Sequence, residues 1–457
     1  MTERVDVVVV GLGVGGEEVA GRLAEAGLAV VGVEGRLVGG ECPYWGCVPS
    51  KMMIRAGNLL AEARRVPGMA GASQVAPDWA PVAARIREEA TDNWDDKVAV
   101  DRFVGKGGRF VRGWGRLAGP GRVEVGDQTF EARIGVVIGT GTAPVVPPID
   151  GLAGTPFWTN REAVEAEALP GSLIVLGGGA VGLELAQAYA RFGVAVTVVE
   201  ALDRLLPVEE PEASALAETA LQADGITVHT GVRAARVAHD AGRFTVSLDD
   251  GADLGAERLL VAVGRHATLA GLGLDTVGLD PAAPAVQVDG RMRAGQRLWA
   301  VGDVTGHGAF THVATYQAGI AASDILGRGG PPADYRAVPR VTFTDPEIAA
   351  VGLLEAQARQ AGMTVQVGLA RVPSTARGWI HKAGNDGFIK LVADADRGVL
   401  VGATSAGPAG GEVLGALAVA VHGQVPVDRL RQMIYAYPTF HRGIEDALRD
   451  LHPVTNG

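Results

Sequence analysis

Two cysteines, Cys42 and Cys47, are the residues of this sequence best suited to redox chemistry. They are the only cysteines among 457 residues, and four residues separate them. Such a pair can exchange electrons as a disulfide and a dithiol, bind a metal, or be purely structural. Cys47 lies just before an expected helix start, with Pro49 near the first turn and Lys51 close by. A helix N-terminus and a lysine both favour a thiolate, so we favour redox chemistry.

A metal site at this pair is not expected. Tetrahedral zinc needs four protein ligands, or three and a water molecule. No histidine lies near the two cysteines, and the nine histidines of the chain are scattered. The sequence therefore predicts no metal centre.

The elements that must position this loop form a repeat. In each of two units, a short apolar run leads into G-x-G-x-x-G, a helical stretch follows, and a second strand ends on a glutamate. The acid comes 23 residues after the first glycine in both (34 − 11 and 200 − 177). This is the βαβ context that the dinucleotide-binding fingerprint requires. The first unit has Gly11, Gly13, Gly16 and Glu34, and the second has Gly177, Gly179, Gly182 and Glu200.

Each glycine loop is suited to a pyrophosphate. The first glycine allows a tight turn, the second lets backbone approach the anion, and the third lets helix pack on strand. The helix N-terminus then presents unpaired N–H groups to the anion, and the glutamate accepts hydrogen bonds from ribose hydroxyls. Two such sites suggest two dinucleotides, a tightly held flavin and a diffusible nicotinamide, with hydride passing between them.

Composition excludes several partner classes. Hydrophobic residues make up 47% of the chain and the formal net charge is -11. No basic stripe is available to neutralise phosphates, so we expect no nucleic acid and no anionic membrane surface. No apolar run reaches the ~18 residues of a spanning helix, and the first residues lack a signal-peptide layout. We infer a cytoplasmic protein whose partner is a small-molecule electron acceptor.

Residues 328–339 are the strongest linker signal in the chain, and a Pro-rich turn lies near 144–151. The region after the linker, 340–457, contains no phosphate loop. It shows alternating strand patterns (GFIKLVAD and VLVGATSAG) and two late helical stretches. We expect a mixed α+β region there that could carry dimer contacts.

The cysteine loop, 39–51, resembles the G-G-x-C-x4-C-x-P-S-K motif of the pyridine nucleotide–disulfide oxidoreductases. That family includes dihydrolipoamide dehydrogenase, glutathione reductase and mercuric reductase, and the resemblance spans essentially the whole chain. Four further segments resemble parts of the family pattern. Gly139-Thr140-Gly141 resembles its flavin strand, and Val263-Gly264-Arg265 resembles its second such strand. Ala300-Val301-Gly302-Asp303 resembles its flavin aspartate motif, and Thr344-Asp345-Pro346-Glu347 resembles the start of its dimerisation domain.

The resemblance implies roles for individual residues. Cys47 faces the flavin, Cys42 exchanges with the acceptor, and Lys51 pairs with Glu184 near the flavin ring. Hydride passes from the nicotinamide to the flavin, then electrons pass to the disulfide and on to the acceptor. FAD is held by Gly11, Gly13, Gly16, Glu34, Lys51, Thr140, Gly141, Gly302 and Asp303. The nicotinamide cofactor is held by Gly177, Gly179, Gly182, Glu200 and Gly264.

The resemblance also implies the architecture. We predict an α/β fold with two Rossmann-type dinucleotide-binding domains and an α+β dimerisation domain. The FAD domain is discontinuous (1–150 and 268–338), the NAD(P) domain covers 151–267, and the interface domain covers 339–457. A homodimer is carried over from the family.

The C-terminal region departs from the family pattern. The family's disulfide reductases carry a His-Pro-x-x-x-Glu acid/base dyad there, but this chain has Tyr437 and Arg442 at those two positions. A phenol, with a reference pKa of about 10, is a poor base at neutral pH. His441, expected one helical turn after Tyr437, is the candidate substitute base. For Arg442 we favour an ordinary ion pair over a role in holding an anionic acceptor.

The nicotinamide preference can be read in part. Glu200 can accept from a free ribose 2′-OH and would repel a 2′-phosphate, which favours NADH over NADPH. Arg204 offers the only compensating positive charge nearby, and we expect it to be a solvated charge at a helix start.

We interpret the chain as an FAD-dependent enzyme that oxidises NAD(P)H through the Cys42–Cys47 disulfide. The first hypothesis for the acceptor is a disulfide or related sulfur-containing small molecule, with His441 or Tyr437 assisting. A second is a quinone or dye reductase, or a transhydrogenase-like enzyme, acting directly from flavin, which the missing dyad favours. The third is a redox-sensing flavoprotein with negligible turnover. The mercuric reductases carry a cysteine pair near the C-terminus that this sequence lacks.

Overall fold

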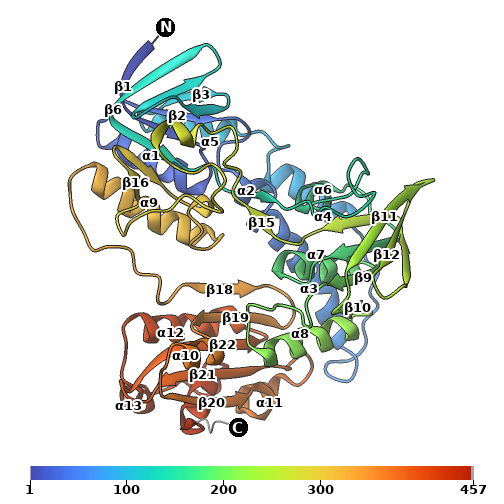
Figure 1. Ribbon diagram of the computed structural model, residues 1–457. Coiled ribbons are helices and arrows are strands. Elements are labelled where there is room, and N and C mark those ends of the chain that lie inside the picture. The colour runs from blue at the N-terminus through green and yellow to red at the C-terminus, as the bar shows by residue number, and fades with distance from the viewer. Residues whose placement is uncertain (1, 454–457) are drawn as a thin grey trace. The chain divides into compact units, whose positions relative to one another are not determined.

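The computed structural model describes residues 2–453, which gather into two compact units (Figure 1). The N-terminal unit consists of the residues up to Pro49, Ala84–Val145 and Gly264–Tyr335. The C-terminal unit consists of Ser50–Ala83, Val146–Val263 and the residues from Arg336 on. The chain thus enters each unit more than once. The three-domain boundaries given above stay a prediction.

The N-terminal unit is built on an eight-stranded sheet with the main order β16-β17-β6-β1-β2-β3, to which β5 and β4 are added beside β6. Its strands are β1 (Thr2–Val10), β2 (Val30–Glu34), β3 (Arg109–Arg112), β4 (Gly115–Leu117), β5 (Arg122–Val125), β6 (Gln128–Ile138), β16 (Arg293–Gly295) and β17 (Leu298–Ala300), with a separate pair β7 (Ala143–Pro144) and β15 (Arg265–His266). Its helices are α1 (Val14–Glu25), α2 (Glu41–Tyr44), α5 (Lys97–Gly105), α9 (Thr311–Ile325), the π-helix η1 (Ile86–Ala90) and the 3-10 turns η2 (Leu274–Val277) and η3 (Asp303–Thr305).

The valine-rich run of β1 explains the centre of this sheet. β1 pairs in parallel with both β2 and β6, and Val7–Val10 are buried on both faces. A strand that is buried on both faces has a continuous run of apolar residues in its sequence, instead of alternating apolar and polar residues. On one face, α1 and α9 supply Leu23 and Ala318 to the core, and β4 and β5 cover the other.

The C-terminal unit contains a second parallel sheet with the order β10-β9-β8-β14, together with an antiparallel meander β11-β12-β13. The strands are β8 (Ser172–Leu176), β9 (Ala195–Glu200), β10 (Thr227–Thr230), β11 (Ala234–Asp240), β12 (Arg243–Leu248), β13 (Asp253–Ala256) and β14 (Arg258–Val261). The accompanying helices are α6 (Asn160–Glu165), α7 (Ala180–Arg191) and α8 (Pro211–Ala223). Two helices, α3 (Cys47–Arg65) and α4 (Ala80–Arg85), contain the points at which the chain passes between units.

The same unit ends in a six-stranded antiparallel sheet with the order β18-β19-β22-β21-β20-β23 (Figure 1). Its strands are β18 (Pro339–Thr342), β19 (Glu347–Gly352), β20 (Val365–Arg371), β21 (Phe388–Asp394), β22 (Val399–Gly407) and β23 (His452–Pro453). Its helices are α10 (Glu355–Gln360), α11 (Ala376–His381), α12 (Gly410–His422), α13 (Val427–Arg431) and α14 (Gly443–Arg449), with the 3-10 turn η4 (Val372–Ser374).

Two details of the expected C-terminal region are wrong. Strands β21 and β22 are buried at every position instead of alternating. Helices α12 and α14 cover one face, while Val392 and Val401 join α10 on the other, so neither face meets water. Three helices rather than two follow β22 in the described residues, because the short α13 was not anticipated.

The predicted α/β class is confirmed. The N-terminal sheet has a parallel centre with antiparallel additions, the sheet β10-β9-β8-β14 is parallel, and the C-terminal region combines an antiparallel sheet with helices. Between residues 2 and 453, no helix combines the length and apolar character needed to cross a membrane.

A buried ion cluster joins the C-terminal sheet to α8. The Lys390 ammonium on β21 contacts carboxylates of Glu210, Glu212 and Glu355 at 3.0, 2.8 and 2.9 Å. Lys390 itself is 2% exposed. Burial alone would raise the pKa of Glu355, but the hydrogen bond and charge of Lys390 outweigh it and hold that pKa below its ordinary value.

We expect Lys390→Met to lower the free energy of unfolding at pH 7.5 by about 3 kcal/mol, because the buried carboxylate of Glu210 loses its cation. Glu355 loses one of its two cations and keeps Arg359. A depressed carboxyl pKa stabilises the fold above the unfolded-state pKa, and this stabilisation is lost as pH falls. The deficit of the variant should therefore shrink once the pH falls below the ordinary glutamate pKa of 4.5, so urea unfolding should give a smaller deficit at pH 3.5 than at pH 7.5. The exposed Lys97→Met is the matched control and should leave the midpoint unchanged. An equal deficit at both pH values would contradict the prediction.

Candidate functional site

Two glycine loops have the same geometry, one in each unit. The first joins β1 to α1 and the second joins β8 to α7. The carboxylate of Glu34 accepts from the Leu12 N–H at 2.8 Å, and that of Glu200 accepts from the Gly178 N–H at 2.6 Å. The other oxygen of each carboxylate accepts from the N–H two residues further on, in each case at 2.8 Å. Both predicted acids therefore lie against their own loops.

The glycines differ in the space around them. A Cβ on Gly16 would lie 1.9 Å from the Gly11 carbonyl oxygen, and one on Gly182 would lie 2.3 Å from that of Gly177. These third glycines let helix and strand approach closely, as expected. A Cβ on Gly179 would meet nothing within 4 Å. The second loop is thus packed on its protein side and open in front, which fits a pyrophosphate against the N-terminus of α7.

The first loop is open in the same way. A Cβ on Gly13 would meet only the Gly139 carbonyl oxygen, at 3.9 Å. Gly11 and Gly177 adopt positive φ values of 89° and 110°, a region that glycine reaches without strain. Both loops therefore have the conformation and the free space that a dinucleotide requires.

The cysteine loop lies in the N-terminal unit, where α2 contains Cys42 and α3 begins at Cys47. Both side chains are thiols in the structure. The Sγ of Cys47 lies 3.5 Å from Thr311 Oγ1, at the first residue of α9. A hydrogen bond with Cys47, together with burial and the charge of Cys47, raises the pKa of Cys42 well above its ordinary value. The pair can therefore hold one thiolate and one thiol, with the proton on Cys42.

Thr311 was not predicted from the sequence. It follows Asp303 by eight residues and is the first residue of α9. Its hydroxyl approaches the thiols only because α9 begins beside the cysteine loop. No spacing rule within the sequence could have shown this.

Asp303, at the start of η3, lies in a polar group of the N-terminal unit. Its carboxylate accepts from Thr142 Oγ1 at 3.0 Å, and Arg265 Nε donates to the same hydroxyl at 2.9 Å. Burial raises the pKa of Asp303, although the Thr142 hydrogen bond opposes this. The N–H of the preceding Gly302 donates to buried Gln317 at 2.7 Å. Thr142 and Gln317 are further residues that the sequence reasoning missed, and Arg265 was named there only as part of a motif, without a role.

Three other predicted positions are turn residues of the N-terminal unit. Thr140 and Gly141 follow the end of β6, and Gly141 has a φ of 66°. Gly264, with a φ of 128°, accepts the Val145 N–H on its carbonyl at 2.9 Å. Added Cβ atoms at Gly141 and Gly264 would meet nothing within 4 Å. These turns are therefore open, as a ligand-facing backbone would be.

The expected ion pair between Lys51 and Glu184 is present in the C-terminal unit. The Nζ of Lys51 lies 2.6 Å from Glu184 Oε2, and it lies 4.6 Å from the centre of the Phe343 ring. The other oxygen of Glu184 accepts from the Phe343 N–H at 2.8 Å. Glu184 is buried while Lys51 keeps about a third of its side chain exposed. The ammonium is thus held by one carboxylate and still reaches solvent or a ligand.

The segment with Tyr437 and His441 is not helical, so the expected spacing of one helical turn is wrong. Residues 434–442 form turns and irregular backbone before α14 begins. Pro438 disfavours helical backbone at the residue before it, which explains the difference. Tyr437 is 69% exposed. The His441 Nε2 lies 3.4 Å from Thr439 Oγ1.

Arg442 forms the ordinary ion pair that the sequence favoured. Its guanidinium lies 3.1 Å from Glu445 and 5.5 Å from the Tyr437 ring centre. Arg442 therefore occupies the position at which the family dyad has a glutamate, and its partner is the nearby Glu445.

Arg204 corrects another expectation. It is half-buried rather than solvated, and its guanidinium donates to the carbonyls of Leu206, Pro207 and Glu209 and to Ser214 Oγ, at 2.6 to 3.3 Å. The loop after β9 folds around this side chain and accepts hydrogen bonds from both terminal nitrogens of the guanidinium. The sequence could not show this, because the carbonyls become acceptors only when the loop folds back.

The structure brings some predicted residues together within one unit. The cysteines lie with Thr311, and the Asp303 group lies with the first glycine loop, in the N-terminal unit. Lys51, Glu184, the second loop, Tyr437 and His441 belong to the C-terminal unit. In the described part of the chain, no group of three or more His, Cys, Asp or Glu side chains is arranged to hold a metal ion.

Comparison with known proteins gives two family matches. Residues 5–318 match the pyridine nucleotide-disulphide oxidoreductase model, and residues 338–448 match the dimerisation domain of the same family. The chain is 33% identical over 465 residues to a dihydrolipoyl dehydrogenase of Thermus scotoductus, covering 98% of this chain and 97% of that protein. It is 35% identical over 457 residues to a mercuric reductase of Streptomyces lividans, covering 96% and 94%.

Solved structures agree with these matches. LpdA of Mycobacterium tuberculosis superposes with a TM-score of 0.86 at 28% identity, over 97% of this chain and 99% of that one. The HOCl-induced flavoprotein disulfide reductase RclA of Escherichia coli, solved as a Cu(II) complex, gives 0.86 at 25% identity, over 98% and 99%. The chain therefore belongs to the pyridine nucleotide-disulphide oxidoreductases, and it is an FAD-dependent enzyme that uses NAD(P)H.

Proposed function

We propose that this enzyme passes electrons from NADH through FAD and the Cys42–Cys47 disulfide to a small disulfide or related sulfur-containing acceptor. The observation that carries the proposal is the thiol pair itself: two cysteines in contact, one at a helix start, with Thr311 against them. Cys47 is exposed and Cys42 is half-buried, so neither residue is enclosed in the core as a purely structural pair would be.

The first loop is the FAD site in this proposal, together with Glu34, Lys51, Thr140, Gly141, Gly302 and Asp303. The second loop, with Glu200 and Gly264, is the nicotinamide site. When bound, FAD accepts hydride from the nicotinamide and delivers two electrons to the disulfide. The open space in front of Gly13 and Gly179 supports both assignments.

The cysteines supply the remaining chemistry. Two electrons and two protons convert their disulfide to two thiols, and Cys47 ionises first because it begins α3. The thiol of Cys42 must then lose its raised-pKa proton to attack an acceptor disulfide. Attack breaks the acceptor S–S bond and forms a mixed disulfide, and Cys47 then displaces it to restore the protein disulfide. The net reaction is NADH, a proton and one disulfide giving NAD⁺ and two thiols.

His441 is the proposed base for the Cys42 proton, with Tyr437 assisting. Histidine titrates near neutral pH, whereas a tyrosine does not. Both side chains lie on the same irregular segment before α14.

A quinone or dye reductase is the second candidate. The replacement of the family's His and Glu by Tyr437 and Arg442 favours it, since acceptors reduced directly from flavin need no thiol acid/base chemistry. Mercuric ion, which the name of one relative suggests, is less favoured because the sequence has no cysteines besides Cys42 and Cys47.

NADH is favoured over NADPH. Glu200 would repel a 2′-phosphate, and Arg204 has its donors committed to its own loop. Arg204 is therefore held in its own loop and is poorly placed to balance the charge of Glu200.

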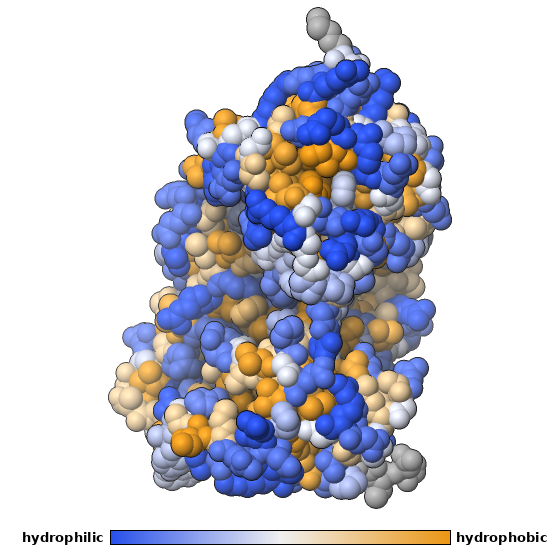
Figure 2. Space-filling model, turned by 90° about the vertical axis from the view of Figure 1, so that its left-hand side faces the viewer, coloured by the Kyte–Doolittle hydropathy of each residue, from blue (hydrophilic) through white to orange (hydrophobic). Residues whose placement is uncertain are grey.

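A homodimer is the proposed assembly, supported by the dimerisation-domain match. Hydrophobic groups reach the surface among hydrophilic ones on the face drawn in Figure 2. In the matched region, large apolar side chains are exposed at Trp379, Val419, Ile434 and Tyr437. Such exposure is typical of a surface that is covered on association.

We expect Gly179→Ala to fold normally but to raise the KM for NADH at least tenfold, because the added methyl enters the space assigned to the pyrophosphate. Gly182→Ala should instead lower the melting temperature, because its Cβ collides with the Gly177 carbonyl. Gly415→Ala, on the open face of α12, is the control; it should leave the KM for NADH unchanged and should not lower the melting temperature. Unchanged NADH kinetics in Gly179→Ala would contradict the assignment of the second loop.

We expect Glu200→Gln to raise the ratio of kcat/KM for NADPH to that for NADH about tenfold, or about 1.4 kcal/mol, since the repulsive charge is removed while an acceptor oxygen remains. The neighbouring exposed acid allows a charge-matched control, Asp203→Asn, which should leave the ratio unchanged. Equal ratios in both variants would show that Glu200 does not set the preference.

The decisive experiment for the acceptor uses Cys42→Ser with two acceptor classes. Disulfide turnover should fall at least a hundredfold, while reduction of a quinone should persist, because only the former needs the interchange thiol. Before any NADH is added, Cys42→Ser should already show a long-wavelength thiolate–flavin band, because Cys47 can no longer be held as a disulfide, and Cys47→Ser should lack this band. Failure of the unmodified enzyme to reduce any disulfide, with rapid quinone turnover, would select the second candidate.

A further inference from the structure

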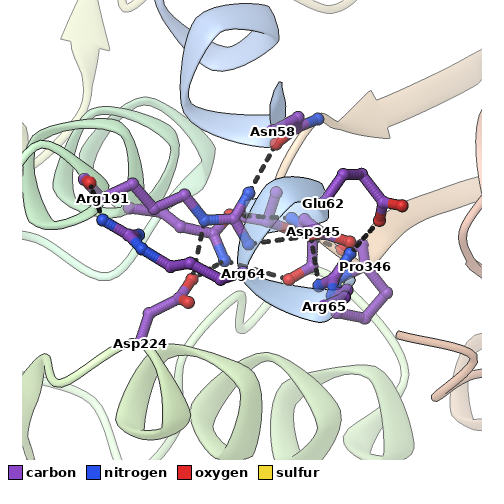
Figure 3. Close-up of polar contacts among 10 residues, drawn as sticks. Asn58, Glu62, Arg64, Arg65, Arg191, Asp224, Asp345 and Pro346 are labelled. Carbon is purple, nitrogen blue, oxygen red and sulfur yellow. Dashed lines mark hydrogen bonds and ion pairs between the residues drawn. The ribbon is translucent and has the colours of Figure 1, made fainter. Parts of the chain in front are cut away.

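Asp345 lies in the turn between β18 and β19 and joins the far ends of two helices. Its Oδ2 accepts from Arg65 on α3 at 2.7 Å and from Arg191 on α7 at 2.8 Å (Figure 3). The Arg191 side chain is 2% exposed and that of Asp345 is 13% exposed. One carboxylate oxygen therefore receives two guanidinium groups away from bulk water.

The backbone of the same turn also follows α7. The Phe343 N–H donates to Glu184 at 2.8 Å. The Asp345 N–H donates to Gln187 Oε1 at 2.7 Å, and Gln187 Nε2 donates to the Asp345 carbonyl at 3.0 Å. Glu184, Gln187 and Arg191 lie three and four residues apart, so they share one face of α7. The segment between β18 and β19 is thus hydrogen-bonded to α7 along two turns of that helix.

Helix α3 meets α7 through a matching stripe. Lys51, Asn58 and Arg65 recur every seven residues and so lie on one face. Lys51 contacts Glu184 at 2.6 Å, and Asn58 accepts from Arg191 at 2.5 Å. Both pairs join residues 133 positions apart in the chain. The two helices therefore run parallel with a fixed register, in which a shift by one residue would break both pairs.

We propose that Asp345 is a positioning residue for the Lys51–Glu184 pair, because it locks the register of α3 and α7 from the ends remote from that pair. The inference rests on the proposed function, in which Lys51 lies at the flavin and the second loop holds the nicotinamide. Arg191 is also paired with Asp224 at 3.0 Å, and Arg65 is also paired with Glu62 at 2.5 Å. Each arginine keeps one carboxylate partner when Asp345 is neutralised, so neither is left as an unpaired buried charge. The substitution should therefore act by loosening the register of α3 against α7.

Electrostatics links this register to the cofactor. A cation near the flavin stabilises its more negatively charged reduced form, and the interaction weakens with distance. A Lys51 ammonium that is no longer held against Glu184 in one place would stabilise that form less. Asp345 thereby influences hydride acceptance without touching substrate or cofactor.

The test compares Asp345→Asn with Glu62→Gln in the full-length holoenzyme. Each change removes one carboxylate charge from Arg65, but the side chain of Glu62 is 56% exposed and does not contact α7 through any bond in the described structure. We expect Asp345→Asn to slow anaerobic flavin reduction by NADH at least fivefold and to shift the flavin midpoint potential to more negative values. The KM for NADH should change less than twofold, and Glu62→Gln should match the unmodified enzyme throughout.

Asn58→Ala is a milder second variant, should Asp345→Asn yield too little folded protein. It removes the oxygen that faces Arg191, and it should shift the potential in the same direction. Asn58→Asp, which keeps that oxygen, should restore the unmodified value. Folded Asp345→Asn and Asn58→Ala with unchanged reduction rate and potential would overturn the inference. If the unmodified holoenzyme is not reduced by NADH at all, the proposed function fails instead.

Discussion

The bonds between the Glu34 and Glu200 carboxylates and the glycine-loop amides are the interactions on which the rest of the structure depends. Each bond closes the turn between a buried parallel strand and the helix that follows. The contact of the third glycine with the first glycine's carbonyl then sets how near that helix lies to its strand. The helix start determines where the N–H groups of the first turn point, and on α7 it also determines where Glu184 lies.

Much of this could be predicted from the sequence, because short-range chemistry determines it. Gly16 and Gly182 tolerate no side chain, and the acids at fixed spacing must return to their loops. Lys51 and Glu184 were paired through the family resemblance, and the structure contains that contact. Thr311, Gln317 and Asp345 could not be predicted. Their partners are distant in the chain, and a single threonine or aspartate has no pattern that marks a contact formed only on folding.

The wrong expectations for Arg204 and for the His441 segment have one cause: both depend on the backbone conformation of a loop. We expected Arg204 to be a solvated charge, because its partners include backbone carbonyls, which every residue has and no sequence pattern marks. The segment around His441 seemed helical because its spacing suits a helix, but Pro438 prevents it. The consequence for chemistry differs between them. The first holds the Arg204 guanidinium within its own loop, whereas the second removes the simple geometric relation between Tyr437 and His441.

The Lys51–Glu184 and Asn58–Arg191 pairs between α3 and α7 determine where the chain between these helices can gain or lose residues. Their register is held by side chains of the two helices, not by the chain that joins them. The connecting residues, 66–179, contribute strands to the other unit before the chain returns. Insertions or deletions in the surface loops of that stretch alter the sequence offset of the pairs without moving the helices. Evolution can therefore lengthen or shorten this stretch while the Lys51–Glu184 contact is inherited unchanged.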